Sequence, residues 1–242
     1  MLIYPAIDLR GGRVVRLTQG DYDRMTVYGD DPVDVAQGFV QAGATCLHAV
    51  DLDGAKDGSP QNRTVIGQLC KLPLSVEVGG GMRTEADVEA TLALGTERVI
   101  LGTVAVEDFG MVERLVARWG ARIAVGVDAR GGKVATRGWR EVSDLDGVAF
   151  CRKLADAGVA TVIYTDIGRD GALSGTNLDV YACLSGIAGL QVIASGGVSF
   201  ETEIAALRDM GLYGCILGKA LYAGKLRLER ALAIARGEAQ PC

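Results

Sequence analysis

The stretch Ile7-Asp8-Leu9-Arg10-Gly11-Gly12-Arg13-Val14 returns near the midpoint of the chain as Val127-Asp128-Ala129-Arg130-Gly131-Gly132-Lys133-Val134. In both copies an apolar run ends in an aspartate and continues into a glycine turn. The two aspartates are 128 − 8 = 120 positions apart in a chain of 242 residues. This repeat predicts two similar halves, about 1–120 and 121–242, in which Asp8 and Asp128 occupy equivalent places and face each other.

Further segments repeat in the same order with nearly the same spacing. The matches are 43–62 with 158–177 at an offset of 115, Gly80-Gly81 with Gly196-Gly197 at 116, and 100–103 with 216–219 at 116. Such an ordered series indicates duplication of a whole structural unit.

Short apolar segments of β character alternate with segments of helical character along the whole chain. We expect strands over 2–7, 46–50, 74–78, 98–101, 123–127, 161–165, 191–194 and 214–217. We expect helices over 32–42, 60–71, 84–94, 107–119, 144–157, 177–187, 200–210 and 226–236. Several strands are apolar at nearly every position, which is typical of parallel strands covered on both faces. Eight β-α pairs and the halving favour one α/β domain over residues 1–242, a (β/α)₈ TIM barrel built from two repeated half-barrels, over an open sheet.

Composition excludes several classes of function. The formal net charge is −5 and no basic run occurs, so a nucleic-acid partner is not expected. No apolar stretch has the length needed to span a membrane, and the N-terminus has no basic region of a signal peptide. The six cysteines are scattered and there is one histidine, so we predict no metal site and free, buried thiols in a cytoplasmic protein.

Paired glycine sites follow the third, fourth, seventh and eighth predicted strands. In barrels, the backbone amides after strands 7 and 8 often bind phosphate. The candidate phosphate ligands are Gly80, Gly81, Gly102, Thr103, Gly196, Gly197, Gly218 and Lys219. Two such sites predict a small-molecule substrate with a phosphate at each end. The alternative is that these glycines only permit tight turns.

Asp8 and Asp128 end the first and fifth predicted strands, where barrel enzymes place catalytic groups. Two carboxylates on opposite sides of a pocket suit proton donation at one atom and removal at another. The alternative is that each aspartate caps its own glycine turn. Asp51 and Asp166, at the ends of strands 2 and 6, are kept out of the catalytic set.

Three other side chains, Arg16, Arg83 and Trp139, have two interpretations each. Arg16 and Arg83 are candidate clamps for phosphate or sugar, with surface placement as the alternative. Trp139 either stacks on a flat ring or covers the rim of the barrel. The single histidine, His48, lies inside the second strand and is interpreted as structural.

Several motifs together resemble the HisA isomerase family over nearly the whole chain. They are Pro5-Ala6-Ile7-Asp8-Leu9, Gly12-Arg13-Val14-Val15-Arg16-Leu17, Gln19-Gly20-Asp21-Tyr22, Val50-Asp51-Leu52-Asp53-Gly54-Ala55, Val78-Gly79-Gly80-Gly81-Met82-Arg83 and Thr165-Asp166-Ile167-Gly168-Arg169-Asp170-Gly171. The resemblance implies a twofold-repeated barrel that needs no cofactor and isomerises phosphoribosylformimino-aminoimidazole carboxamide ribonucleotide, a substrate with two phosphates, in histidine biosynthesis. Tyr4, Glu77 and Thr176 depart from the family pattern, which more usually has glutamine at the position of Glu77.

The resemblance also implies roles for single residues. Asp128 would protonate the ribose ring oxygen, Asp8 would remove the proton on C2, and Thr165 would assist Asp128. Trp139 would stack on the imidazole. Gly81 and Thr103 match one phosphate site, and the other matches Asp170, Gly171, Gly197 and Gly218.

Three alternatives remain at this stage. The chain could be a HisF-type cyclase on the same duplicated barrel, or a dual-specificity isomerase that also takes phosphoribosyl anthranilate. A third possibility, from a different class, is a non-catalytic barrel that only binds phosphorylated ligands. We expect a monomer.

Overall fold

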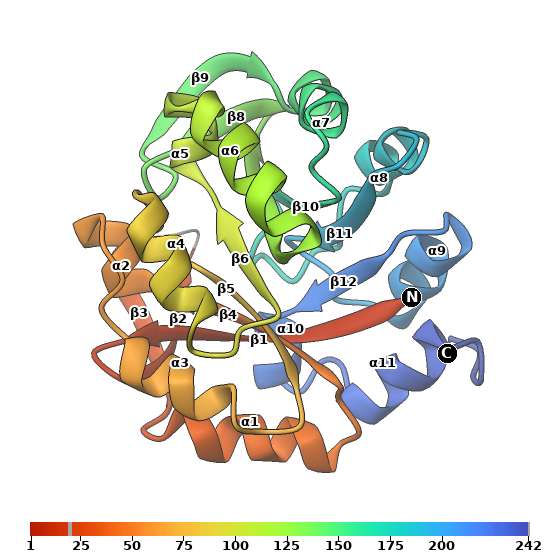
Figure 1. Ribbon diagram of the computed structural model, residues 1–242. Coiled ribbons are helices and arrows are strands. Elements are labelled where there is room, and N and C mark those ends of the chain that lie inside the picture. Colours follow the sequence, from red (N-terminus) through yellow and green to blue (C-terminus); the bar gives the residue numbers. More distant parts are fainter. Residues whose placement is uncertain (19–20, 242) are drawn as a thin grey trace.

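The computed structural model describes residues 1–18 and 21–241, and its centre is a closed ring of eight parallel strands (Figure 1). In ring order these are β1 (Leu2–Arg10), β4 (Cys46–Asp51), β5 (Ser75–Gly79), β6 (Arg98–Leu101), β7 (Ile123–Arg130), β10 (Thr161–Asp166), β11 (Gln191–Ser195) and β12 (Gly214–Leu217). The β7–β10 and β12–β1 pairings close the ring, so the barrel has no open edge. The predicted (β/α)₈ barrel is confirmed, with all eight strands at the expected places.

Helices surround the ring and connect successive strands. The main ones are α1 (Pro32–Gln41), α3 (Arg63–Leu69), α4 (Glu85–Leu92), α6 (Phe109–Trp119), α7 (Gly147–Asp156), α8 (Leu178–Ser185), α9 (Glu201–Asp209) and α11 (Leu228–Ala235). Side chains of Asp31, Thr84, Asp108, Asp146 and Asn177 accept backbone N–H bonds at five N-termini. Two predicted helices were too long at their starts. Residues 60–62 precede α3 because Asp51 binds the amides of Gln61 and Asn62, and 144–146 belong to a strand.

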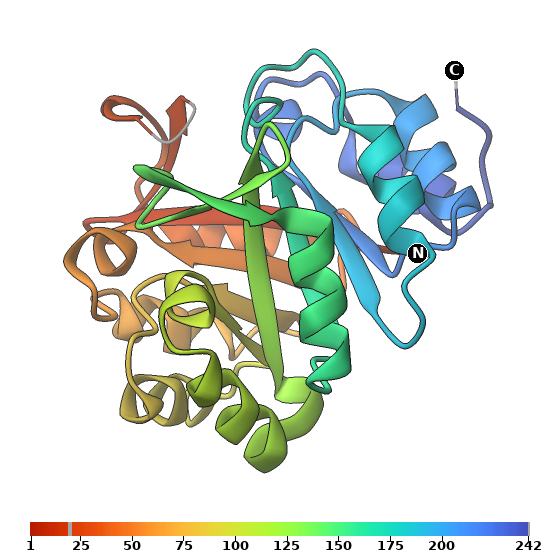
Figure 2. The ribbon, with the colours of Figure 1, turned by 90° about the horizontal axis from the view of Figure 1, so that it is seen from above.

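Two antiparallel hairpins were not predicted. β2 (Arg13–Thr18) and β3 (Asp21–Gly29) follow β1, and β8 (Lys133–Thr136) and β9 (Glu141–Asp146) follow β7. Figure 2 shows the first hairpin, in red, projecting away from the barrel. Because β1 and β7 are parallel, both hairpins leave the ring at the same rim. Short elements α2 (Leu52–Asp57), α5 (Thr103–Glu107), η1 (Gly120–Arg122) and α10 (Lys219–Tyr222) were also not predicted.

The two halves have matching local geometry. The turns at Gly11-Gly12 and Gly131-Gly132 have φ values of 56° and 75° in one and 58° and 80° in the other. The Asn62 side-chain amide donates to Asp51 at 2.7 Å, and that of Asn177 donates to Asp166 at 2.8 Å. The ion pair of Glu85 with Arg114 likewise returns 116 positions later as Glu201 with Arg230. The division of the chain near residue 120 stays a prediction supported by these pairs.

The hydrophobic core has two parts. A large cluster fills the space between strands and helices, and a small one inside the ring comprises Tyr4, Ala6, Cys46, Ile100, Ala124, Ile163, Ile193 and Ile216. The cysteines among the described residues are free, and their burial differs. Cys46, Cys151 and Cys215 are buried, as expected, and Cys70 is half-buried. Cys183 is free but exposed, so the expectation of burial was wrong there. Cys242 and the Gln19-Gly20 part of the family motif lie outside the described residues.

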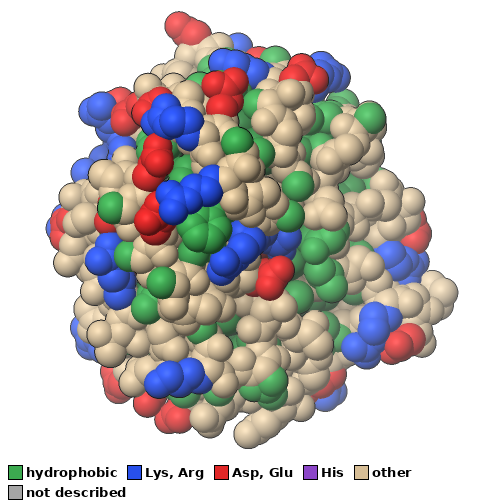
Figure 3. All heavy atoms as spheres, viewed as in Figure 1, with side chains coloured by type: hydrophobic (Ala, Val, Ile, Leu, Met, Phe, Trp, Pro, Cys, Tyr) green, Lys and Arg blue, Asp and Glu red, His purple; other side chains and the backbone are tan. Residues whose placement is uncertain are grey.

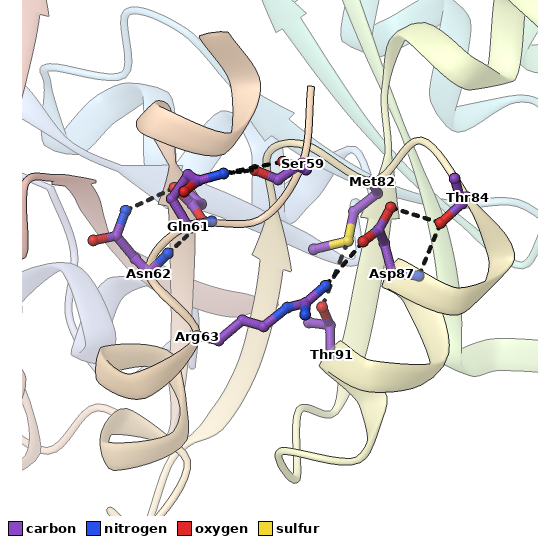
Figure 4. A network of polar contacts seen from close by, with 9 residues as sticks. Ser59, Gln61, Asn62, Arg63, Met82, Thr84, Asp87 and Thr91 are labelled. Atoms are coloured by element: carbon purple, nitrogen blue, oxygen red, sulfur yellow. Dashed lines mark hydrogen bonds and ion pairs between the residues drawn. The ribbon is translucent and has the colours of Figure 1, made fainter. Parts of the chain in front are cut away.

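Ion pairs connect neighbouring helices on the outer surface. Acidic and basic side chains alternate on the face over α4 and α6 (Figure 3), where Arg114 pairs with Glu85 and Arg118 with Glu89. Between α3 and α4, Arg63 donates to Asp87 at 2.9 Å, and Thr84 donates to the same carboxylate (Figure 4). Along the described part of the chain, no helix is long and apolar enough to cross a bilayer.

Candidate active site at the carboxyl ends of the strands

A pocket of about 260 Å³ opens at the carboxyl ends of the barrel strands. All sixteen candidate residues line it: Asp8, Arg16, Gly80, Gly81, Arg83, Gly102, Thr103, Asp128, Trp139, Thr165, Asp170, Gly171, Gly196, Gly197, Gly218 and Lys219. His48 and Arg137, which were not among the candidates, line it as well. The structure thus brings the predicted residues together, and their roles are proposals taken up below.

Asp8 projects into the pocket from β1 and is bound by Arg16 from the adjacent strand β2. Nη1 of Arg16 lies 2.8 Å from Oδ2 of Asp8. The glycine turn that follows Asp8 is held by other side chains, because Gly11 N–H donates to Asp53 at 2.6 Å and Gly12 N–H to Asn62 at 3.1 Å. The alternative that Asp8 merely caps its own turn is therefore wrong, and its carboxylate is available to the pocket.

Arg16 is fixed on several sides. Its Nη2 donates to the Ala6 carbonyl at 2.8 Å, and the Tyr222 ring lies 5.2 Å from its guanidinium carbon. Burial acts to lower the pKa of Arg16, but the Asp8 carboxylate, followed by Tyr222 and Asp170, outweighs burial and raises that pKa. Arg16 is therefore a permanent, immobile cation beside Asp8.

Asp128 lies on β7, which is four strands from β1 in either direction around the ring and hence opposite Asp8. Burial raises the pKa of Asp128, because the pocket floor solvates a carboxylate poorly. Polar interactions with Trp139 and Thr165, and the nearby His48, act in the opposite direction. The two aspartates thus have different surroundings. Asp8 is bound by an arginine, whereas Asp128 is buried where water solvates its carboxylate poorly.

Asp170 follows β10 and joins the same group of charges. Burial raises its pKa to about 6, with Arg16 and Lys219 lowering it and Asp8 and Asp128 raising it. A carboxyl group that titrates near neutrality is suited to proton transfer. Asp170 was predicted only as a residue of a phosphate site, and nothing in its local motif indicates that the fold brings several carboxylates together around it.

Two helix N-termini present backbone amides to the pocket from opposite halves. Gly102 caps α5 with φ −105° and ψ −107°, and Gly218 caps α10 with φ −110° and ψ −107°. Amides at a helix start attract anions. Lys219, at the second of these sites, donates to the Gly171 carbonyl at 2.9 Å. At the first, Thr103 accepts the N–H of Arg137 at 2.8 Å.

The paired glycines after β5 and β11 have a structural requirement. A Cβ on Gly80 would lie 2.2 Å from the Asp51 carbonyl oxygen, and one on Gly196 would lie 2.5 Å from that of Asp166. Both residues have positive φ, 108° and 90°. Glycine is therefore required by the backbone at these two positions, and a phosphate contact there remains a prediction.

The aspartates that precede those turns have structural partners. Asp51 is fully buried and accepts from the backbone amides of Gly54, Gln61 and Asn62. Asp166 accepts from Gly168 N–H at 3.0 Å. Leaving both out of the catalytic set agrees with these bonds.

Two further candidates, Arg83 and Trp139, line the same pocket. Arg83 is 3.4 Å from Glu107, which also pairs with Arg137 at 3.0 Å. Arg137 and Trp139 have positive φ values of 53° and 69°, so their loop is held in a conformation that side chains rarely adopt.

Comparison with known proteins identifies the relatives of this chain. A family model described as histidine biosynthesis protein matches residues 2–227. A protein from Brachyspira hyodysenteriae is 47% identical over 237 residues, covering 98% of this chain and 100% of the relative. One from Rhizorhabdus wittichii is 49% identical, covering 98% and 99%, and one from a Synechococcus strain is 50% identical, covering 96% and 92%. All three are named 1-(5-phosphoribosyl)-5-((5-phosphoribosylamino)methylideneamino) imidazole-4-carboxamide isomerase. Because the matches span nearly its full length at about half identity, the chain belongs to the histidine biosynthesis protein family, among the HisA isomerases.

Proposed function

We propose that this protein isomerises the aminoaldose that its relatives are named for, a compound with two phosphoribosyl groups, to the aminoketose. The observation that carries the proposal is the facing pair Asp8 and Asp128, because it offers two carboxyl groups with different surroundings across one pocket. An aldose–ketose isomerisation needs one group to give a proton and another to remove one.

The proposed sequence begins at Asp128. In its protonated form, favoured by burial, it donates a proton to the ribose ring oxygen, and the ring opens to an imine. Asp8, held beside Arg16, then removes the proton from C2 and gives an enolamine. Protonation at C1 and loss of the C2 hydroxyl proton give the ketose and restore both aspartates. Thr165 orients Asp128. Each step is a proton transfer, so the proposal invokes no cofactor.

The two phosphates would bind at opposite sides of the pocket mouth. Gly81, Gly102 and Thr103 supply one site, and Gly171, Gly197, Gly218 and Lys219 the other. Arg16 and Arg83 lie near these sites but are paired with Asp8 and Glu107, respectively. Trp139 would stack on the imidazole ring. We further propose that the protein is a monomer that acts on a small bisphosphate, and the family's biosynthetic role supports a cytoplasmic location.

The test is a coupled spectrophotometric assay. Purified protein is incubated with the aminoaldose, and an ammonia-supplied cyclase consumes the ketose. Wild type should turn over, and Asp8→Asn and Asp128→Asn should each lose about 10²- to 10⁴-fold in kcat, the usual range for a general acid or base. Near-normal turnover by either variant would refute its assigned role. Asp170→Asn is included, because a larger loss there than in Asp128→Asn would make Asp170 the acid.

The same assay decides between the alternatives. Wild-type protein is also given phosphoribosyl anthranilate, and turnover of both substrates would show dual specificity. Binding of a bisphosphate ligand without any product would show the non-catalytic barrel.

A further inference from the structure

A column of buried polar side chains runs down the inside of the barrel from the pocket floor. Nδ1 of His48 is 2.7 Å from Oε1 of Glu77, and Nη2 of Arg98 is 3.4 Å from Oε2 of Glu77. Arg98 also donates to the Tyr4 hydroxyl at 2.6 Å. The Glu77 side chain is only 1% exposed, so this ionisable group lies in the interior of the barrel.

The barrel architecture itself does not require this column. Residue 77 corresponds to residue 193 in the second half at the offset of 116 that relates Gly80 to Gly196, and residue 48 corresponds to 163 at the offset of 115 that relates Asp51 to Asp166. At these equivalent places the second half has Ile193 and Ile163, both buried and apolar. Equivalent positions inside the barrel hold apolar side chains in the second half and polar side chains in the first. The polar side chains of the first half therefore indicate a role beyond packing.

The column ends at a ring nitrogen that faces the active site. His48 lines the pocket, and among the described residues its Nε2 has no hydrogen-bond partner, whereas Nδ1 is bound to Glu77. A carboxylate only accepts hydrogen bonds, so the proton of the imidazole must be on Nδ1 whenever the ring is neutral. A glutamine amide at position 77 could donate as well as accept and would not impose this tautomer.

Several charged groups face the pocket floor on which His48 lies. Asp128 from β7 is close enough for His48 to lower its pKa. Asp8 with Arg16, from β1 and β2, and Asp170 with Lys219, after β10 and β12, complete the set around the pocket. His48 and Asp128 therefore contribute to one electrostatic environment.

We propose that Glu77 is a positioning residue that fixes the Nδ1–H tautomer of His48 and thereby turns Nε2 toward the pocket, in the same electrostatic environment as Asp128. Arg98 forms an ion pair with the Glu77 carboxylate and is itself bound to the Tyr4 hydroxyl. The inference rests on the proposed function only where it concerns turnover, because the tautomer of His48 is a property of the free protein.

The decisive measurement uses the fact that the chain has one histidine. Nitrogen-15 NMR of histidine-labelled wild-type protein should show one imidazole with its proton on Nδ1 in the pH range where the ring is neutral. In Glu77→Gln, the same spectrum should show a mixture of tautomers. A proton on Nε2 in wild type, or an unchanged spectrum in the variant, would overturn the proposal. The wild-type spectrum decides the matter even if Glu77→Gln fails to fold.

Kinetics provide the second readout. Glu77→Gln and His48→Gln should each lower kcat by roughly 10- to 100-fold, the cost of a misplaced active-site group, with a smaller effect on KM. Loss of His48 removes an influence that lowers the Asp128 pKa, so the limb of the pH profile at which Asp128 loses its proton should move to higher pH in His48→Gln. If kcat falls at every pH while the limb stays at the same pH, His48 has a merely structural role and the inference is contradicted.

The matched control is Ile193→Val, at the position equivalent to Glu77. It perturbs packing inside the barrel without changing any hydrogen-bonding group of the column, and it should leave both the His48 spectrum and the pH profile unchanged. If wild type shows the Nδ1–H tautomer but does not act on the aminoaldose, the proposed function fails while the tautomer assignment holds.

Discussion

Arg16 and Asp8 are joined across two antiparallel strands by an ion pair of 2.8 Å, and both side chains are about 15% exposed. The register places Asp8 opposite Val15, so that Arg16 reaches back along β1 to the carboxylate and to the Ala6 carbonyl. Arg16 was interpreted from the sequence as a clamp for phosphate or sugar. Its observed partner supports a second proposal, that it orients the candidate base.

The two roles of Arg16 predict different kinetics. In Arg16→Gln, Asp8 loses its cation and its fixed orientation, and kcat should fall by roughly 10- to 100-fold. Arg16→Lys keeps the charge but not the planar guanidinium that binds both Asp8 and Ala6, so the decrease in its kcat should be intermediate. Steady-state kinetics on the aminoaldose provide the check. An increase in KM with unchanged kcat would restore the phosphate-clamp interpretation.

Asp170 predicts a pH-dependent change in stability. Its pKa is raised from 3.8 to about 6, so the folded protein binds this proton more tightly than the unfolded chain does. The stability that Asp170 contributes is full below about pH 4 and is lost as the pH rises through about 6. Asp170→Asn should therefore gain stability over wild type by at most about 3 kcal/mol at pH 7.5, and the gain should disappear near pH 4. Thermal unfolding of both proteins from pH 4 to 8 tests this, and a gap that does not vary with pH would contradict it.

The glycine at position 80 predicts a large folding defect on substitution. Gly80→Ala combines positive φ with a 2.2 Å contact to backbone, which should cost about 3 kcal/mol or more. Gly196→Ala, the equivalent change, should behave alike. Gly12→Ala separates the two causes, because Gly12 has φ +75° but no atom within 4 Å of the added Cβ. Denaturant titration should show a loss of only about 1 kcal/mol there. Equal losses at positions 12 and 80 would show that the contact is unimportant.

Gly102 predicts the opposite result, a change in binding with a smaller change in stability. Its φ is negative, and a Cβ there would meet no atom within 4 Å. Gly102→Ala should keep the fold with a smaller loss of stability than Gly80→Ala, and its methyl group would stand where backbone amides are proposed to meet a phosphate. We expect KM to rise about tenfold, which corresponds to 1.4 kcal/mol of lost binding. Unchanged KM together with unchanged stability would remove α5 from the phosphate site.

The sequence was sufficient to predict the ring of strands and the location of the pocket. The repeat of Asp8 at Asp128 and of Gly80 at Gly196 located equivalent strand ends, and parallel strands bring such ends to one rim. The hairpins after β1 and β7 were missed for a physical reason. Strand β9 has an alternating exposure pattern and half-polar composition, and it runs directly into α7, so its residues 144–146 looked like the start of the helix.

Relationships that depend on tertiary contact could not be predicted. Arg16 pairs with Asp8 only because a hairpin folds back, and nothing in the spacing of eight residues distinguishes this from two independent side chains. The raised pKa of Asp170 arises from burial and from groups on other strands. Glu77 departs from the family pattern, but its contact with His48 could not be predicted from that. The two residues are 29 positions apart in the sequence and meet only because their strands pair.

The matching caps of α5 and α10 have a consequence for the direction in which a two-ended ligand lies. Gly102 and Gly218 present almost identical backbone, so a phosphate at either end of the ligand meets the same geometry on either side. The choice between two opposite orientations would then come from unlike side chains, including Thr103 and Lys219 at the caps themselves. At equivalent positions the first half has Arg16 and His48 and the second has Thr136 and Ile163, and all four line the pocket. These unlike side chains would make the two ends of a nearly symmetric pocket distinguishable to the ligand.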